Sequence, residues 1–235
     1  MRKIIKRSIF LVILATGIIF LLNTKVTTKQ GINYHVYRIK IPLYLKILDF
    51  YTRHYDYKWL VDRIINNSAN EEEKVLAILR WTKENIVPQP TQLRVVDDHA
   101  WNIIIRGYGT DDQFQDTFTT LCNYAGVAAF FTRVQTPDGN NIKWLSFVDI
   151  NQKWCLFDAF YGAYFRNKSG RIASSEDLIR DNWDCVYIKK SDFQAPDYRD
   201  FFQNIDFVNQ GEWKLSRSAI QSPLRRFAFW LKKGK

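Results

Sequence analysis

The sequence predicts an α+β fold in which a central helix packs on an antiparallel sheet, behind an apolar helix at the N-terminus. Three observations carry this prediction. Residues 8–22 are an uncharged apolar run. Residues 111–125 carry a helical stripe of apolar side chains. Runs rich in β-branched and aromatic residues follow at 127–135, 142–150 and 153–158.

The apolar run at 8–22 follows a basic cluster within the first seven residues. Because the flanking basic side chains can reach toward water, about 18–20 residues can cross a bilayer. A small-residue cleavage motif does not follow, so we expect residues 1–25 to be an uncleaved membrane anchor. A cleaved signal peptide and a buried core helix are the alternatives. The basic flank predicts a single-pass protein of the inner (cytoplasmic) membrane, with its domain outside the cytoplasm, periplasmic or extracellular.

Residues 26–66 are predicted to be a tether followed by a membrane-proximal helix. The loose alternation of residues 34–41 suits an extended segment that adds an edge strand, and residues 43–65 carry a helical pattern. A further helix is expected from the capping pattern at Asn70 to about Ile86, where prolines follow.

The central helix begins after the turn at 106–110. Thr110 suits the N-cap, Asp111 and Asp112 suit the positive end of the helix dipole, and Gly126 suits the C-terminal stop. The residues of its apolar stripe are Phe114, Phe118, Leu121, Cys122 and Ala125.

Two turn signals divide the strands that follow. Pro137-Asp-Gly-Asn140 separates the first two runs, and Asn151-Gln152 separates the second from the third. The middle strand is therefore predicted to pair with both others. We assign the globular domain to residues 67–210.

The net charge of +10 lies mostly at the two ends of the chain. Because the body between them is nearly neutral, we expect no nucleic-acid partner. Residues 211–235 are predicted to be a basic amphipathic tail, with a helix that starts at Ser222-Pro223. That helix can lie on the membrane, dock on a partner or pack on its own domain.

An exported domain with three cysteines allows at most one disulfide. Cys122 belongs to the buried helix stripe, so Cys155 with Cys185 is the pairing we expect.

Five short motifs follow one another from the end of the central helix onward. They are Gly126-Val-Ala-Ala129, Leu145-Ser-Phe-Val-Asp149, Trp154-Cys-Leu-Phe-Asp158, Gly162-Ala-Tyr-Phe165 and Ser174-Ser-Glu-Asp-Leu178. In their order and spacing, over about residues 70–180, they resemble the bacterial transglutaminase-like branch of the papain-type superfamily. In that family, a helix begins with the nucleophilic Cys, a later strand begins with His, and the next strand ends in Trp-x-x-x-Asp.

The resemblance places Asp111 at the nucleophile, Leu145 at the general base and Asp158 at the third position of the catalytic triad. A carboxylate is a poor nucleophile toward an amide, and Leu145 cannot accept a proton. We therefore expect no catalytic residue, and Asp111 is most simply a carboxylate that stabilises the start of its helix.

The former cleft supplies the candidate binding residues His99, Trp101, Tyr108, Asp112 and Trp144. Trp154 and Tyr161 are further aromatic residues for its rim, and aromatic side chains there suit a sugar or peptide. The simpler interpretation is that these rings belong to the core. His99 is the one histidine close enough in sequence to repair the site. Metal-ligand spacings are absent, so we expect no metal and no cofactor.

The sequence thus favours a membrane-anchored pseudoenzyme that binds or scaffolds, with the membrane and envelope proteins or a polysaccharide as partners. The link to cell-envelope or surface-polysaccharide assembly is what the resemblance implies. The alternative is a hydrolase that uses Asp111, Asp112 and Asp158 on a glycan or peptide. A third possibility is a nucleophile elsewhere, if the alignment to the family is shifted.

Overall fold

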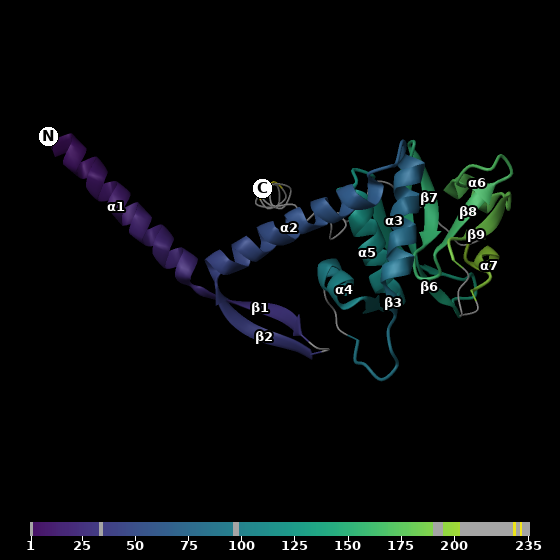
Figure 1. Ribbon diagram of the computed structural model, residues 1–235, viewed down its shortest axis with the longest axis horizontal. Helices are drawn as coiled ribbons and strands as arrows, with labels where there is room; N and C mark the ends of the chain where they lie inside the picture. The colour runs from purple at the N-terminus through teal and green to yellow at the C-terminus, as the bar shows by residue number, and fades with distance from the viewer. Residues whose placement is uncertain are drawn as a thin grey trace. The chain divides into compact units, whose positions relative to one another are not determined.

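The chain forms two compact units, residues 1–53 and 54–235. The computed structural model describes residues 2–32, 35–95, 99–189, 195–202, 228 and 231, without the side chains of 2, 29–32 and 35–37. Figure 1 shows the elements of both units in order along the chain.

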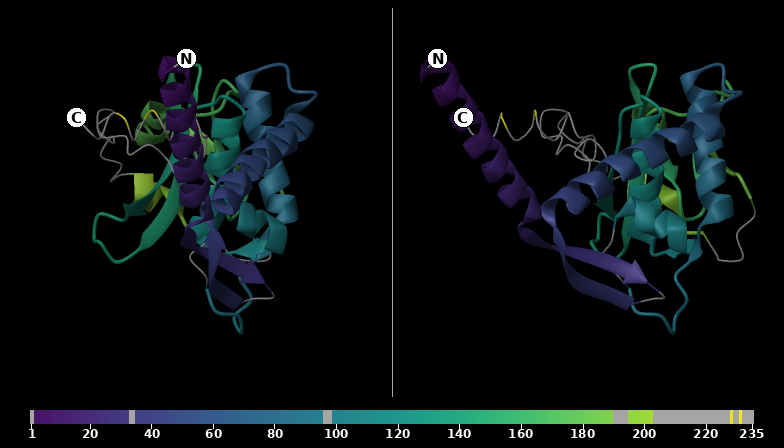
Figure 2. Two further views of the ribbon diagram at one scale, coloured as in Figure 1. Left: turned by 90° about the vertical axis from the view of Figure 1, so that its left-hand side faces the viewer. Right: turned by 60° about the vertical axis from the view of Figure 1, so that its left-hand side comes forward.

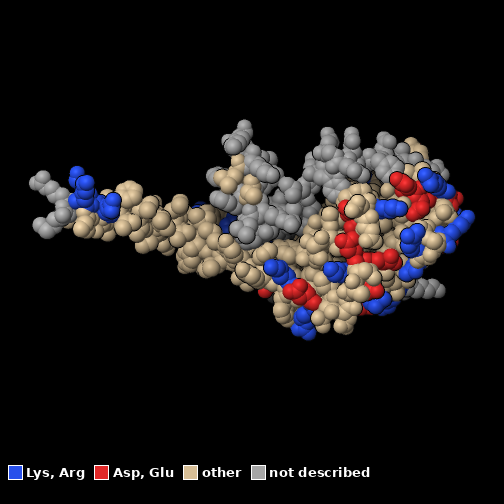
Figure 3. Space-filling model, turned by 90° about the horizontal axis from the view of Figure 1, so that it is seen from above, with Lys and Arg blue, Asp and Glu red and all other residues tan. Residues whose placement is uncertain are grey.

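The first unit begins with α1 (Arg2–Asn23), a helix with the length and composition to cross a membrane. Within Lys3–Asn23, an 18-residue window has a mean hydropathy of 2.2, and none of that window is buried. Figure 3 shows it as an uncharged rod with basic residues at its far end. An anchor and a signal sequence both fit this helix, whereas a buried core helix does not, because its apolar side chains are exposed.

A hairpin of β1 (Lys25–Ile32) and β2 (His35–Pro42) follows α1. We expected an extended segment here that adds an edge strand to the domain. That expectation is wrong, because β2 pairs with β1 in a separate two-stranded sheet. The β-branched residues of β1, such as Val26 and Thr27, supply a local partner strand.

Helix α2 (Leu43–Ile65) begins directly after the hairpin, as its pattern predicts. Its C-terminal part belongs to the second unit, where Tyr57 and Val61 are buried in the core. The next helix, α3 (Glu71–Asn85), starts at the expected cap, where the Glu73 amide donates to the Asn70 side chain at 2.9 Å.

The second unit is built around α5 (Asp111–Tyr124) and one antiparallel sheet of order β5-β6-β7-β8-β9. The expectation that the middle strand pairs with both neighbours is confirmed for the first three strands, and two further strands extend the sheet. The bounds of the five strands are β5 Ala129–Gln135, β6 Ile142–Ile150, β7 Lys153–Asp158, β8 Ala163–Asn167 and β9 Trp183–Tyr187. Both residues of the turn between β6 and β7 have positive φ, as a tight hairpin requires.

Apolar cores lie on both faces of this sheet. The core on one face contains the buried stripe of α5, which confirms the predicted helix face. The second core packs against α6 (Ser175–Ile179) and α7 (Tyr198–Phe202). Figures 1 and 2 show α3 and α5 on one side of the sheet and α6 and α7 on the other. Short elements complete the first face: β3 (Val87–Pro88) pairs in parallel with β4 (Tyr108–Gly109), and α4 (Ala100–Arg106) lies between them in the chain.

All three cysteines are free, so the expected Cys155–Cys185 pairing is wrong. Strand β8 lies between β7 and β9, which carry these residues. Strands two places apart are about 10 Å apart, beyond the reach of a disulfide. The two residues also belong to different faces of the sheet, since Cys155 lies in one core and Cys185 packs against the other.

The predicted amphipathic tail at 211–235 lies outside the described residues, apart from Ala228 and Leu231. Both of these positions are helical and exposed.

Candidate functional site

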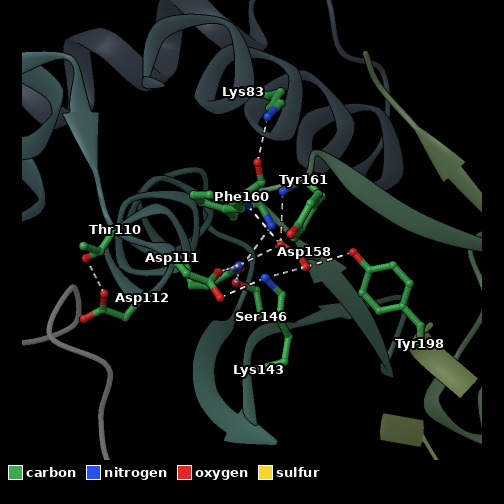
Figure 4. A network of polar contacts seen from close by, with 12 residues as sticks. Lys83, Thr110, Asp111, Asp112, Lys143, Ser146, Asp158, Phe160, Tyr161 and Tyr198 are labelled. Atoms are coloured by element: carbon green, nitrogen blue, oxygen red, sulfur yellow. Dashed lines mark hydrogen bonds and ion pairs between the residues drawn. The ribbon is translucent and has the colours of Figure 1, made fainter. Parts of the chain in front are cut away.

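The candidate site lies where α5 begins, β6 begins and β7 ends (Figure 4). Asp111 is the first residue of α5, Lys143 is the second of β6, and Asp158 is the last of β7. Gly109 allows β4 to pass close to the start of α5, because a Cβ there would lie 3.1 Å from the Gln113 side chain. The backbone amide of Thr110 then donates to the Gln113 side chain at 3.2 Å and fixes the start of the helix.

Lys143 joins the two carboxylates. Its Nζ lies 2.8 Å from Asp111 Oδ2 and 3.2 Å from Asp158 Oδ2. The Lys143 side chain is 9% exposed, that of Asp111 27%, and that of Asp158 is fully buried. The ammonium also lies 4.5 Å from the centre of the Tyr161 ring, a cation–π contact that shields it from water.

Gln115 forms a second bridge, one helical turn into α5. Its Nε2 donates to Asp111 Oδ1 at 3.2 Å and to Asp158 Oδ1 at 3.1 Å. Its Oε1 accepts from Ser146 Oγ at 2.7 Å and from the Ala159 amide at 3.1 Å. Both donors and both acceptor sites of the amide are therefore used, and the side chain has one defined orientation.

Asp158 is the best-satisfied carboxylate of the group. Besides Lys143 and Gln115, it accepts from the amides of Phe160 at 3.0 Å and Tyr161 at 3.2 Å. The hydroxyl of Tyr198 donates to its Oδ2 at 2.9 Å, from α7. A buried carboxylate needs such donors, because its loss of hydration is otherwise costly.

Burial and the position of one cation between two anions shift the pKa values of Lys143 and Asp111. Burial lowers the pKa of Lys143, but Asp158 and Asp111 outweigh it, and the net pKa of Lys143 is raised. Burial raises the pKa of Asp111; Lys143 opposes this effect, Asp158 adds to it, and the net pKa is also raised.

These two shifts point in opposite senses for one ion pair. A raised lysine pKa favours the charged pair, and a raised aspartate pKa disfavours it. The difference has a physical cause: Lys143 faces two carboxylates, whereas Asp111 shares the Lys143 ammonium with Asp158. Lys143 therefore stays protonated, and Asp111 is the less firmly charged partner.

Leu145, the residue expected at the general-base position, lies elsewhere. It is fully buried in the second core, together with Phe147 and Leu156. Sequence reasoning missed Lys143, which stands two residues earlier at the beginning of the strand. It also missed Gln115, Ser146 and Tyr198. One feature of the resemblance could have pointed to Lys143: in the family, the general base is the residue at the beginning of its strand.

The other candidate residues predicted from the sequence contact residues outside the Lys143 network. His99 is the exposed N-cap residue of α4. Trp101 lies edge-on to Tyr57 at 5.1 Å and packs on the first core, and Trp144 lies edge-on to Phe131 at 5.8 Å.

Two further candidates contact groups other than Lys143. Tyr108 is buried, with the Arg106 guanidinium 5.2 Å from its ring centre. Asp112 accepts from the Thr110 hydroxyl and points away from Lys143 in Figure 4. Of the aromatic rim, Tyr161 contacts Lys143, and Trp154 packs against the second core.

None of the three thiols is poised to react. Burial raises the pKa of Cys122 and of Cys185, and it raises the pKa of Cys155 to about 12. A thiol with a raised pKa is a poor nucleophile near neutral pH. Among the residues that the structure describes, no group of three or more His, Cys, Asp or Glu side chains could hold a metal ion.

A separate cavity of about 170 Å³ lies at α6, β9 and α7, away from the ends of β6 and β7. An ion pair of Arg199 and Asp181, 3.2 Å apart, borders it. Its lining residues are Leu178, Ile179, Asp181, Trp183, Arg199 and Phe202.

Residues 58–159 match the transglutaminase-like superfamily, and this match agrees with the helix packed on an antiparallel sheet described above. No curated protein matches the chain at a significant level.

Solved structures of low identity are similar to the chain. A candidate cysteine protease from Cytophaga hutchinsonii has 19% identity and a TM-score of 0.41, over 66% of this chain and 61% of that one. A candidate protease from Parabacteroides distasonis has 15% identity and a TM-score of 0.37, over 57% of this chain and 35% of that one. A TGase has the same identity and TM-score, over 57% of this chain and 43% of that one. The chain thus spans between 35% and 61% of the length of these structures.

Proposed function

We propose that this protein is a membrane-anchored, extracytoplasmic transglutaminase-like pseudoenzyme that binds or scaffolds rather than transfers acyl groups. Its proposed setting is cell-envelope or surface-polysaccharide assembly, in contact with envelope proteins or a polysaccharide. That setting comes from the resemblance to the family, and α1 supports the membrane attachment.

The observation that carries the proposal is the position of the Lys143 ammonium between Asp111 and Asp158. In the family, the helix begins with a thiol and the strand begins with an imidazole. Here a carboxylate stands at the helix start and a protonated amine at the strand start. An ammonium has no lone pair to take up a proton, and a carboxylate paired with it is a weak nucleophile.

The hydrogen bonds around Asp158 favour a structural role for the remnant of the triad. The ammonium and the Gln115 amide each contact both carboxylates. These contacts therefore connect α5, β6 and β7. The hydrogen bond from Tyr198 to Asp158 connects α7 to them as well. We propose that this network replaced the reaction and keeps the shape of the domain.

A hydrolase that uses Asp111, Asp112 and Asp158 is less well supported. Such chemistry needs two carboxyl groups on either side of a bound substrate. The Lys143 ammonium and the Gln115 amide lie between Asp111 and Asp158, and the Asp112 carboxylate turns toward Thr110. The raised pKa of Asp111 is the one property that suits a catalytic acid.

The test compares the full chain in detergent with two double variants that introduce the missing thiol and imidazole. We expect no cleavage or cross-linking of peptide amides, and no turnover of a glycan panel, by the unmodified protein. Asp111→Cys with Lys143→His should gain rapid alkylation by iodoacetamide near neutral pH, by about tenfold or more over a free thiol. An imidazolium and a helix N-terminus both stabilise a thiolate.

The matched control is Asp112→Cys with Lys143→His, which moves the thiol by one residue along α5. Its alkylation should stay slow, because Asp112 points away from residue 143. Turnover of an amide or a glycan by the unmodified protein, abolished by Asp111→Ala, would show that the pseudoenzyme proposal is wrong.

A further inference from the structure

The end of α1 and the beginning of α2 lie next to each other within the first unit. The hairpin returns the chain to its starting point, since Lys25 pairs with Pro42 at its open end. The Leu43 amide then donates to the Thr24 carbonyl at 2.9 Å. If α1 spans a bilayer, α2 therefore begins at the surface where α1 emerges.

The hairpin has one basic face. Lys25, Arg38 and Lys40 are exposed and stand on the same face of the strand pair, where Lys40 lies opposite Thr27. The alternate positions, such as Ile39 and Ile41, are half-buried. No Asp or Glu precedes Asp49 in the sequence, so the hairpin itself contains no acidic residue.

The first turns of α2 carry exposed apolar and aromatic side chains. Tyr44, Leu48 and Tyr51 are 39%, 56% and 45% exposed. Their spacing of four and three residues places them on one face of the helix. Lys46 ties this helix to the hairpin by donating to the Thr27 carbonyl at 2.8 Å.

We infer that the basic hairpin face and the first turns of α2 dock on the bilayer surface and bind anionic phospholipid headgroups. This inference rests on the proposed membrane anchoring by α1. Tyrosine rings with an apolar body and a polar tip favour the membrane interface, and lysine and arginine are attracted to anionic headgroups. The α2 stripe begins beside the end of the apolar α1, where the Leu43 amide meets the Thr24 carbonyl, and cations flank it. Both properties select a lipid surface over a protein partner.

The test uses the full chain, reconstituted in vesicles that contain anionic phospholipid, with an environment-sensitive fluorophore on a single introduced thiol. Leu48→Cys places the fluorophore on the docking face. Asp49→Cys, one residue along and about 100° around the helix, is the matched control. Cys185→Ser removes the half-buried native thiol, and the other two native thiols are buried. Nitroxide lipids labelled near the headgroup should quench position 48 at least threefold more than position 49.

Vesicles of neutral phospholipid and the charge variant Lys25→Gln, Arg38→Gln, Lys40→Gln form the second arm. Each should reduce the quenching at position 48 by at least half. Equal quenching at positions 48 and 49, or quenching that is independent of charge, would overturn the inference. Extraction with alkaline carbonate separates the two proposals: a protein that is extracted lacks the anchor, whereas one that resists extraction but is not quenched lacks only the docking.

Discussion

The two ends of α5 lie in opposite environments. Toward its C-terminus, Phe118, Leu121 and Cys122 are fully buried in the apolar core. At its N-terminus, Asp111 and Gln115 join a network of charges with β6 and β7. The apolar end stabilises the helix through contact area that any similar side chain could supply. The charged end depends on particular atoms at particular distances.

Removal of the cation at the charged end should have the largest effect. We expect Lys143→Met to lower the free energy of unfolding by about 3–5 kcal/mol near neutral pH, because the buried Asp158 and the partly buried Asp111 then lack their counter-charge. The loss should shrink on acidification, as a carboxyl group takes up a proton. Urea unfolding of the full chain in detergent, at several pH values, measures both effects.

The matched control for this variant removes one anion as well. Asp111→Asn together with Lys143→Met leaves one carboxylate, which retains donors from Gln115, Tyr198 and two backbone amides. Its cost should be clearly smaller than that of Lys143→Met alone. If the two variants were equally unstable, the charge network would not be the cause of the loss.

The apolar end provides the contrasting prediction. Leu121→Ala should cost about 2–4 kcal/mol by removing buried methyl groups and leaving a cavity. No titratable group is involved in that loss, so the cost should be the same from about pH 5 to 8. The same urea series measures it. A cost that changed with pH as strongly as that of Lys143→Met would contradict the distinction between the two ends of α5.

The two ends also differ in how well the sequence predicted them. The stripe of α5 repeats every 3.6 residues and is visible locally, so its burial and the pairing of the three following strands could be predicted. The network joins α5, β6 and β7 to Tyr198, 40 residues after Asp158, and no local pattern records such contacts.

Lys143 shows why the site was harder to assign. A shift of two residues along a strand keeps the same face but moves the side chain by about 6.6 Å. That shift exchanges Lys143 at the beginning of β6 for Leu145 in the second core. A protonated lysine is also not a usual general base, so the residue type did not mark position 143 as part of the site. Trp101 and Trp144 were equally hard to assign, because the sequence does not show whether an aromatic ring faces a core or a cleft.

Asp111 gives the smallest predicted effect and the most sensitive measure of the charged end. Its pKa in the folded protein is raised by burial, so its stabilising contribution is complete below the unfolded value and is lost as the pH rises through the folded value. Asp111→Asn removes this titration. Relative to the unmodified protein, the variant should therefore gain stability between about pH 4 and 7.

The net change at neutral pH should stay within about 1 kcal/mol, because the loss of a negative charge at a helix N-terminus costs about 0.3–1 kcal/mol in the opposite direction. Urea unfolding of both proteins at the two pH values measures the difference. A variant that instead lost stability as the pH rose would show that the attraction of Lys143 outweighs burial at Asp111. Lys143 would then form a conventional stabilising ion pair with both carboxylates, and Asp111 would not be the less firmly charged of the two.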